Sequence, residues 1–317
     1  MNKRAKLIYI SAPGHSGTTI LDLLCGSMSN VFSMGEVHLF SWQLYQGAKK
    51  KDPQTWCSCG EDFKRCNVYG PILNDINKNE SINIFNNPKK YDFSIVRRLE
   101  RHKTSFIKKV VNKFLSLVIK SKFTKFLAYI PYLIYRKSIL RNWQLFDQVT
   151  LRTGNEYVVD SSKSFLRYWL LKMHRPNDVK LLIIKRDLKG VASSSHEGLS
   201  ETIINKKIKS WVRFYNITLK PLKFLDKSDW KLIKYEDFCS NPSKTKSEIA
   251  DFLGLTIVSE NNSDVIIKPF ESHTIEGNPI RLLKKEVKII FDERWKKRLT
   301  ADQIRQINII QSITTIS

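Results

Sequence analysis

The sequence predicts an α/β protein in which a central parallel sheet carries helices on both faces. Short apolar segments typical of strands alternate with segments of helical spacing, and a polar or glycine-containing loop follows each apolar segment. Strands and helices that alternate in this way form parallel sheets. The 317 residues contain no Pro/Gly/Ser-rich linker, and this length is at the upper end for one domain. We therefore expect a single domain over residues 1–317, with an insertion over about residues 50–150.

Four segments are expected to form the strands of this sheet. Residues 7–10 are apolar and end at Pro13-Gly14, after which apolar residues recur at helical spacing. Further strands are expected over residues 157–159, 180–184 and 230–235, and helices over residues 165–173, from Val191 onward and over residues 243–253. Parallel sheets bind ligands where the carboxyl ends of the strands meet their loops, so the four loops are expected at one edge.

Segments outside this alternation have their own predictions. Residues 106–118 carry an apolar stripe with lysines between its members, which predicts an amphipathic helix. The Asn-rich residues 74–87 predict a loop, and residues 299–317 a closing helix. The longest apolar run, residues 126–135, spans 10 residues, whereas a membrane span needs about 20. Since the first residues show no apolar signal region either, we expect a soluble cytoplasmic protein.

The charge of the chain predicts an anionic partner. Lys and Arg number 54 and Asp and Glu 30, a net charge of +24, which favours a nucleotide, a polyanionic glycan, a nucleic acid or an anionic lipid. Between Arg97 and Arg141, 13 basic residues occur with one acid, Glu100. This segment is either a solvated helical face or a contact for a membrane surface or a polyanionic glycan. It lacks the basic–aromatic alternation of nucleic-acid binders, so no nucleic acid is expected.

An anion-binding loop is expected between the first strand and the first helix. It reads Ala12-Pro13-Gly14-His15-Ser16-Gly17-Thr18-Thr19. Unpaired backbone N–H groups and the helix dipole favour an anion at such a junction, and an ordinary tight turn with an N-cap is the alternative. A Walker A loop needs Gly-x-x-x-x-Gly-Lys-Ser/Thr. The shorter spacing and the missing Lys argue against an ATP-hydrolysing enzyme, and a P-loop-type kinase is kept as an alternative function.

Two motifs carry a resemblance to the sulfotransferase superfamily. Residues 13–19 are similar to the loop with which this family binds the 5′-phosphosulfate of its donor, commonly Pro-Lys/Arg-Ser-Gly-Thr-Thr. Residues 184–194 resemble the family's 3′-phosphate motif, in which an Arg at a strand end and a Ser eight positions later bind one phosphate. Arg186 and Ser194 have this spacing. The forked donor set of an arginine suits a phosphate group.

Three shorter segments extend the resemblance from about Leu7 to Trp295. Residues 234–238 resemble the family's strand-terminal Tyr-Glu-Asp-Leu, and residues 160–163 resemble a segment of its bacterial members. Residues 277–281 resemble a loop of many bacterial members that closes over the nucleotide. The resemblance does not extend over residues from about 74 to 150. It implies a sulfotransferase-type fold with a basic helical insertion, 3′-phosphoadenosine 5′-phosphosulfate as co-substrate, the corresponding bisphosphate as product, and no metal. The residues it assigns to the co-substrate are Pro13, Gly14, His15, Ser16, Gly17, Thr18, Thr19, Arg186, Ser194, Tyr235, Gly277, Asn278 and Arg281.

The implied reaction is an in-line transfer of the sulfuryl group to an acceptor hydroxyl, which needs positioning, charge neutralisation and a base. His15 stands where the family has a Lys or Arg beside the leaving oxygen, a role that favours a protonated imidazole. Lys163 is a second cation at this edge. Glu36 matches the base of carbohydrate- and protein-directed members, and His38 is the second choice for that role. Glu36 and the basic insertion favour a saccharide acceptor over a protein or a lipid head group.

Other residues receive non-catalytic predictions. Cys57, Cys59 and Cys66 have the spacing Cys-x-Cys-x6-Cys, which is not a common zinc-finger spacing, and no fourth ligand lies nearby in the sequence. Structural thiols or a late disulfide are therefore favoured over zinc, and the five cysteines are too few for a disulfide scaffold. His196 is predicted to be structural. The rival to an enzyme is a non-catalytic basic module for RNA or anionic lipid, which the two phosphate motifs and Gly35-Glu36 disfavour.

Overall fold

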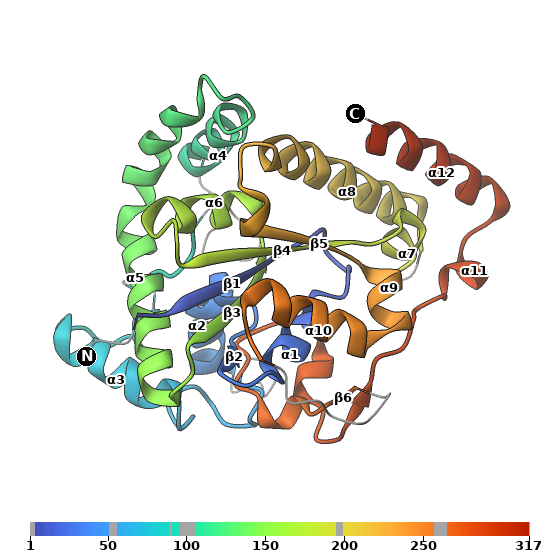
Figure 1. Ribbon diagram of the computed structural model, residues 1–317. Helices are drawn as coiled ribbons and strands as arrows, with labels where there is room; N and C mark the ends of the chain where they lie inside the picture. Colours follow the sequence, from blue (N-terminus) through green and yellow to red (C-terminus); the bar gives the residue numbers. More distant parts are fainter. Residues whose placement is uncertain are drawn as a thin grey trace.

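A five-stranded parallel sheet forms the centre of the computed structural model, which describes residues 4–50, 56–88, 91–95, 106–194, 199–256 and 265–316 (Figure 1). The strand order is β2-β3-β1-β4-β5, and every neighbouring pair is parallel. The predicted α/β class with a parallel central sheet is thus confirmed. The strands are β1 (Lys6–Ser11), β2 (Val31–Ser33), β3 (Tyr157–Lys163), β4 (Val179–Lys185) and β5 (Trp230–Lys234).

Helices cover both faces of the sheet and continue beyond its edge (Figure 1). The α-helices are α1 (Thr18–Gly26), α2 (Phe40–Lys50), α3 (Tyr69–Asn79), α4 (Phe106–Val118), α5 (Tyr129–Thr153), α6 (Phe165–His174), α7 (Leu188–Ala192), α8 (Glu201–Leu222), α9 (Tyr235–Ser240), α10 (Pro242–Leu253), α11 (Trp295–Arg298) and α12 (Ala301–Ile316). Short 3-10 turns and a two-stranded antiparallel pair complete the described elements: η1 (Val37–Leu39), η4 (Lys125–Ala128), η5 (Lys227–Asp229), η6 (Pro269–Glu271), η7 (Pro279–Leu282), β6 (Ile266–Ile267) and β7 (Val287–Lys288).

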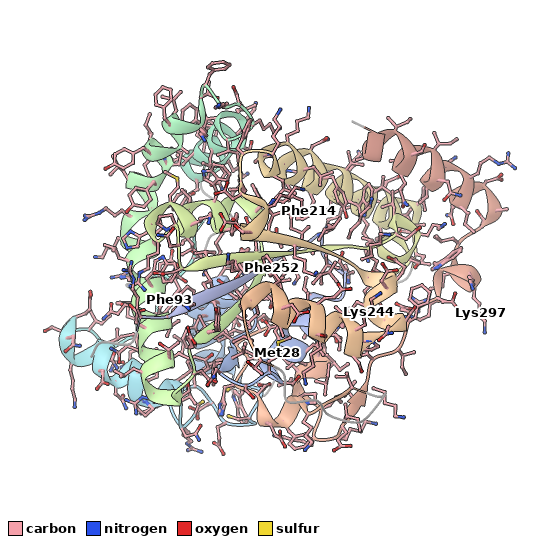
Figure 2. The ribbon with its side chains drawn as sticks, viewed as in Figure 1. Met28, Phe93, Phe214, Lys244, Phe252 and Lys297 are labelled. Atoms are coloured by element: carbon pink, nitrogen blue, oxygen red, sulfur yellow. The ribbon has the colours of Figure 1, made fainter. Side chains whose placement is uncertain are left out.

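The alternation of side chains along β1 divides the core into two layers. Leu7 and Tyr9 belong to a cluster with residues of α2, α3, α5 and α6, whereas Ile8 and Ile10 pack with α1, α9 and α10. Successive residues of a strand point to opposite faces, and both faces of this strand are covered. In Figure 2, Phe93 marks the first cluster and Met28 the second. A third cluster joins α7, α8 and α12.

Three predicted boundaries are corrected by the structure. The Asn-rich segment is helical as far as Asn79, because Ile72, Leu73 and Ile76 are buried at helical spacing in α3. The helix after β4 ends at Ala192, and it starts at Leu188 because the Asp187 side chain accepts a hydrogen bond from the Lys189 N–H and caps it. Strand β5 ends at Lys234, and Tyr235 begins α9.

The predicted amphipathic helix and closing helix are both present. Helix α4 occupies the expected residues, but of its apolar stripe only Val111, Leu115 and Val118 are buried. The predicted apolar run lies in η4 and the start of α5, where Pro131 is tolerated in the first turn. Over the described part of the chain, every helix falls short of the length or the apolar character that crossing a bilayer requires.

Candidate functional site

The loop predicted to bind an anion, residues 12–19, which we call the phosphate loop, lies at the carboxyl end of β1, where the chain turns into α1. Gly17 has φ +85° and precedes the helix, a backbone region that favours glycine. A Cβ atom at Gly17 would lie 2.7 Å from the Tyr235 ring, so the ring of the first residue of α9 lies directly against the loop. Ser16 is fully buried, and no group among the described residues hydrogen-bonds its Oγ. A buried hydroxyl of this kind is costly unless it has a partner.

Arg186 joins the second predicted phosphate motif to this loop. Its Nη1 donates to the carbonyl oxygen of His15 at 2.7 Å, and its guanidinium lies 4.2 Å from the centre of the Tyr235 ring. The arginine is 5% exposed. Three residues predicted from separate motifs, His15, Arg186 and Tyr235, are therefore in contact at one edge of the sheet.

Asp292, which no pattern in the sequence indicated, faces the same arginine. Nη2 of Arg186 and Oδ2 of Asp292 are 3.1 Å apart. Hydrogen bonds from Arg294, and then from Arg186, hold the pKa of Asp292 well below its usual range. An anionic ligand of Arg186 would therefore lie close to the Asp292 carboxylate, which already pairs with the guanidinium.

Ser194 follows α7, two residues after the last helical residue. Its Oγ donates to the carbonyl of Val191 at 2.8 Å and accepts from Nζ of Lys207, on α8, at 3.4 Å. Nη1 of Arg298 donates to the carbonyl of Ser193 at 3.1 Å. Neither cation was found from the sequence: Arg298 lies 105 positions from Ser193, and Lys207 lies on the following helix, 13 positions from Ser194, at no spacing that a motif indicates. His196 lies outside the described residues.

Glu36 and Lys163 form an ion pair between Oε1 and Nζ on the same edge of the sheet. Glu36 is 8% exposed and precedes η1, and its N–H donates to the carbonyl of Glu276 at 3.2 Å. Lys163 ends β3 with φ +68°, an uncommon conformation for a residue with a Cβ. His38 is buried, and its backbone N–H donates to Ser162 Oγ at 3.1 Å. The predicted base and the predicted second cation are thus direct neighbours.

A fully buried ion pair stabilises the end of β3 around Lys163. Nε and Nη2 of Arg167 donate to Oδ2 of Asp160 at 3.1 and 2.8 Å, and both side chains are inaccessible. The other oxygen of Asp160 accepts from the backbone N–H and the hydroxyl of Ser162. Asp160 precedes Lys163 and Arg167 follows it, so the pair fixes the chain on both sides of Lys163. Ser162 in turn holds the backbone of His38.

The loop over residues 277–281, which we call the late loop, lies against the start of α1. The Asn278 N–H donates to Oγ1 of Thr19 at 3.0 Å, and Gly277, at φ +149°, lies so close that a Cβ atom there would be 3.0 Å from the same oxygen. Arg281 is buried, and its Nη1 donates to the carbonyls of Trp56 and Thr274 at 3.0 and 3.1 Å. These hydrogen bonds hold the loop in place, and the assignment of Arg281 to the co-substrate stays a prediction.

Burial also changes the acidity of a carboxyl group beneath the loop. Asp22, on α1, is 1% exposed, and Ser33 Oγ donates to its Oδ1. This burial raises the pKa of Asp22 to about 7. The group therefore changes its charge close to neutral pH.

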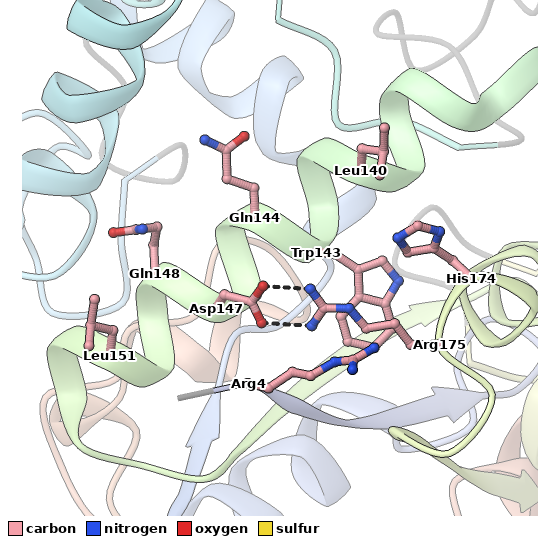
Figure 3. Close-up of a pocket in the computed structure, with 9 residues that line it drawn as sticks. All are labelled: Arg4, Leu140, Trp143, Gln144, Asp147, Gln148, Leu151, His174 and Arg175. Carbon is pink, nitrogen blue, oxygen red and sulfur yellow. Dashed lines mark hydrogen bonds and ion pairs between the residues drawn. The ribbon is translucent and has the colours of Figure 1, made fainter. Parts of the chain in front are cut away.

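A separate pocket of about 550 Å³ lies at the opposite end of the strands, near Arg4 just before β1 (Figure 3). At its centre Arg175 donates to both carboxylate oxygens of Asp147, at 2.7 and 2.6 Å, and its guanidinium lies 4.4 Å from the Trp143 ring. The charges in this pocket are already paired. It is distant from the carboxyl ends of the strands, and we assign it no role in the site.

The fold and the site together define a parallel α/β protein in which an arginine that follows β4 contacts the glycine-containing loop between the first strand and the first helix. No family model matches the sequence, and no curated protein matches it. Solved structures similar to it include the sulfotransferase domain from the curacin biosynthetic pathway, with 14% identity over 98% of this chain and 99% of that one and a TM-score of 0.48. The sulfotransferase domain of a Synechococcus olefin synthase matches at 14% identity over 98% and 95%, with a TM-score of 0.47.

A sulfotransferase from Alicyclobacillus acidocaldarius is similar as well, at 14% identity over 98% of this chain and 96% of that chain, with a TM-score of 0.43. Each of these TM-scores is below 0.5, so the functional conclusion rests on the residues of this chain.

Proposed function

We propose that the protein is a sulfotransferase that moves the sulfuryl group of 3′-phosphoadenosine 5′-phosphosulfate to an acceptor hydroxyl. The observation that carries the proposal is the hydrogen bond of 2.7 Å from Arg186 Nη1 to the His15 carbonyl. It joins a loop suited to one phosphate and an arginine suited to a second one at the same edge of the sheet. A donor with separate 5′ and 3′ anionic groups needs such a pair of sites.

The residues of the loop fit the 5′ group of this donor. The buried Ser16 hydroxyl has no hydrogen-bond partner among the described residues and is available to an anionic oxygen. Gly17 leaves the backbone free to approach that oxygen, and α1 directs its N-terminal N–H groups and dipole to the same place. His15, exposed at φ +64°, supplies positive charge next to the leaving oxygen when it is protonated.

The same edge of the sheet carries a pair suited to the acceptor side. Glu36 would accept the proton of the attacking hydroxyl, and Lys163 holds its carboxylate in place through the ion pair. Lys163 also adds a cation where negative charge develops during transfer. Because a glutamate in the place of Glu36 favours a saccharide, a saccharide hydroxyl is the proposed acceptor, ahead of a protein or a lipid head group.

Calorimetry with 3′-phosphoadenosine 5′-phosphate tests the donor site directly. We expect the full chain to bind this bisphosphate, and the Ser16→Ala variant to bind it about tenfold more weakly, the effect of one hydrogen bond to a charged group. Ser27→Ala, at the other end of α1, is the matched control and should bind normally. Radiolabelled donor incubated with a glycan extract should label an acceptor.

Two outcomes contradict the proposal. Absence of measurable binding of the bisphosphate to the wild-type chain would reject the donor site. Binding that is equal in wild type and Ser16→Ala, without transfer of label, would favour the non-catalytic anion-binding module instead.

A further inference from the structure

Three cysteines and one histidine converge beside the late loop. Cys57, Cys59, Cys66 and His273 each present one ligand atom, and all four atoms lie within 4.8 Å of one another. Cys57 Sγ and Cys66 Sγ are 3.7 Å apart, and Nδ1 of His273 lies 3.6 Å from the first and 3.3 Å from the second. Zinc bound tetrahedrally, about 2.3 Å from sulfur and about 2.0 Å from nitrogen, separates neighbouring ligand atoms by about 3.5–3.8 Å. The three distances that join Cys57, Cys66 and His273 are close to those of an occupied tetrahedron.

The fold brings the fourth ligand from far along the chain. His273 follows Cys66 by 207 positions, so the spacing of the cysteines alone gave no reason to expect it. Its ring stacks on Phe32 with centroids 5.9 Å apart and planes at 12°, which fixes the ring orientation. Cys57 and Cys66 are buried, whereas Cys59 and His273 are half-buried.

Hydrogen bonds of the Ser58 hydroxyl and backbone hold the two segments together around this cluster. Ser58 Oγ donates to the carbonyl of Ser272 at 2.7 Å and accepts from the N–H of Thr274 at 2.7 Å. The Ser58 N–H donates to the carbonyl of Thr274 at 3.2 Å. The residues on both sides of His273 are therefore fixed to the residue between Cys57 and Cys59, and the ligand atoms are prearranged.

We propose that Cys57, Cys59, Cys66 and His273 bind a structural zinc ion. Three sulfur ligands and one imidazole form a donor set that suits zinc. Four protein ligands leave no open position for a substrate, so the ion has a structural role. A disulfide between Cys57 and Cys66 is the competing arrangement, and their sulfur atoms are too far apart for the bond of about 2.05 Å that it requires.

The ion would act on the phosphate loop through the late loop. His273 lies a few residues before Gly277 and Asn278, and these two residues contact Thr19 at the start of α1. Zinc would hold this loop to the segment over residues 57–66. The inference is independent of the donor proposed above, because metal content is measured without any nucleotide.

Metal analysis of the full chain, expressed with added zinc, tests the site. We expect about one zinc per chain, and replacement by Co²⁺ should give the visible d–d bands of tetrahedral cobalt and a sulfur-to-metal charge-transfer band in the near ultraviolet. Cys57→Ser and His273→Asn should lower the zinc content severalfold. Cys239→Ser, which removes a buried thiol outside the cluster, is the matched control and should keep it.

The wild-type cobalt spectrum decides the question even where a variant is insoluble. A chain that retains no zinc and gives no tetrahedral cobalt spectrum overturns the proposal. Loss of free thiols without metal would instead demonstrate the disulfide. Retention of zinc by Cys57→Ser and His273→Asn would place the ion elsewhere and equally reject this site.

A second, independent observation concerns the surface formed by α4, η4 and the start of α5, which we call the α4–α5 surface. Its large apolar side chains are unusually exposed, with Phe123 at 86%, Phe106 at 80% and Phe126 at 69%. Further exposed members are Ile107, Val110, Leu117, Tyr129, Ile130, Leu133 and Ile134. Exposed apolar groups on this scale mark an interaction surface.

The charge of the α4–α5 surface selects its partner. From residue 106 to residue 141 the chain has nine basic residues and no acid. Lys109, Lys113, Lys122 and Lys125 are exposed among the apolar side chains. We infer that this surface docks onto an anionic lipid bilayer, into which the apolar side chains insert while the lysines contact the head groups. A second copy of the chain would carry the same positive charge, and a glycan would leave the aromatic rings uncovered.

Co-sedimentation with vesicles tests this docking. We expect the full chain to bind vesicles that contain phosphatidylserine in phosphatidylcholine. Its binding to vesicles of pure phosphatidylcholine should be at least about tenfold weaker. Phe123→Ser/Phe126→Ser and Lys122→Glu/Lys125→Glu should each reduce binding about tenfold or more. Ile309→Ser/Ile313→Ser removes exposed apolar side chains on α12 and is the matched control.

Three results would overturn the lipid proposal. Absence of binding to the anionic vesicles is the first, and equal binding by all variants is the second. The third is a dimer, measured by light scattering, that Phe123→Ser/Phe126→Ser dissociates. Bisphosphate binding by the same variants separates this surface from the donor site, since it should be unchanged.

Discussion

Nζ of Lys163 pairs with Oε1 of Glu36, which joins the last residue of β3 to the residue that precedes η1. The lysine reaches this position through a left-handed backbone conformation at φ +68°. Such a conformation costs about 1–3 kcal/mol and persists where neighbours hold it in place. Ser11 Oγ donates to the Lys163 carbonyl at 2.7 Å and supplies one such restraint from β1. The ion pair is therefore built into the sheet edge, where Lys163 is bound to Ser11, the last residue of β1 before the phosphate loop.

The first prediction concerns Glu36 as the base. Glu36→Gln keeps the shape of the side chain but cannot accept the proton, so kcat should fall about 10²–10⁴-fold. Affinity for 3′-phosphoadenosine 5′-phosphate should remain within about twofold, because general-base catalysis acts on the acceptor side. Rate and affinity are measured together by radiolabel transfer and calorimetry, with the exposed Glu201→Gln as control. An unchanged rate would shift the role to His38.

Arg186 provides the second prediction. Arg186→Ala should weaken binding of the bisphosphate by about 10–100-fold, the effect of losing charged hydrogen bonds to one phosphate. Binding of adenosine 5′-monophosphate should be weakened far less. Arg175→Ala is a matched control, since Arg175 also stacks on an aromatic ring and pairs with a carboxylate, but in the pocket at the opposite end of the strands. Equal weakening of both nucleotides, measured by calorimetry, would reject Arg186 as the 3′-phosphate ligand.

The third prediction follows from the carboxylate that shares Arg186. Asp292→Asn removes a negative charge 3.1 Å from Nη2 of Arg186 but retains an oxygen that accepts its hydrogen bond. Bisphosphate affinity should therefore rise about two- to fivefold, in line with the strength of a partly exposed ion pair, and the gain should shrink as salt is added. Asp302→Asn, on an exposed turn of α12, should change nothing. A loss of affinity would show that Asp292 positions the arginine.

The sequence was sufficient for the parts of the site that are local in the chain. The turn from β1 into α1 and the position of Arg186 at the end of β4 follow from hydrophobic patterns and strand ends within a few residues. In a parallel sheet these ends must meet at one edge, which places the loop near Arg186 without any long-range information. Strand β2 was missed because its three residues are too short to show a pattern.

The groups that the sequence did not yield are contacts across large separations. Asp292 meets Arg186 across 106 positions, and His273 meets Cys66 across 207. Lys207 reaches Ser194 from a different helix. No local period or spacing encodes such pairs, because they depend on how the late loop and α8 pack on the finished sheet. The Asn-rich helix α3 was missed for a related reason: its buried residues stabilise it through tertiary packing, which outweighs the low helix propensity of asparagine.

The fourth prediction concerns the buried pair of Asp160 and Arg167, both inaccessible to solvent. Arg167→Met leaves the Asp160 carboxylate without its cation, so the free energy of unfolding should fall by about 3–5 kcal/mol. The double variant Asp160→Asn/Arg167→Met should recover part of this loss, because it no longer buries an unpaired charge. Urea denaturation of the single and double variants measures both effects. A loss below about 1 kcal/mol in Arg167→Met would show that water reaches the carboxylate.

The last prediction concerns how the stability of the protein depends on pH through Asp22. Burial raises the pKa of this residue from 3.8 to about 7. Because the folded-state pKa is above the unfolded one, the native protein binds one more proton than the unfolded chain between about pH 4 and pH 7. The stability that this proton contributes is fully present below about pH 4 and is lost as the pH rises to about 7, with a slope of up to about 1.4 kcal/mol per pH unit.

Asp22→Asn keeps the oxygen that accepts from Ser33 and cannot titrate. The stability of wild type relative to this variant should therefore decline steadily between pH 4.5 and pH 7 and level off above the pKa of about 7. Urea denaturation at several pH values measures the difference, and Asp302→Asn, which removes an exposed carboxyl group, should show no such trend. Parallel stability curves for wild type and Asp22→Asn would mean that Asp22 is ionised in the native protein, so that its hydrogen bond from Ser33 would have to outweigh its burial.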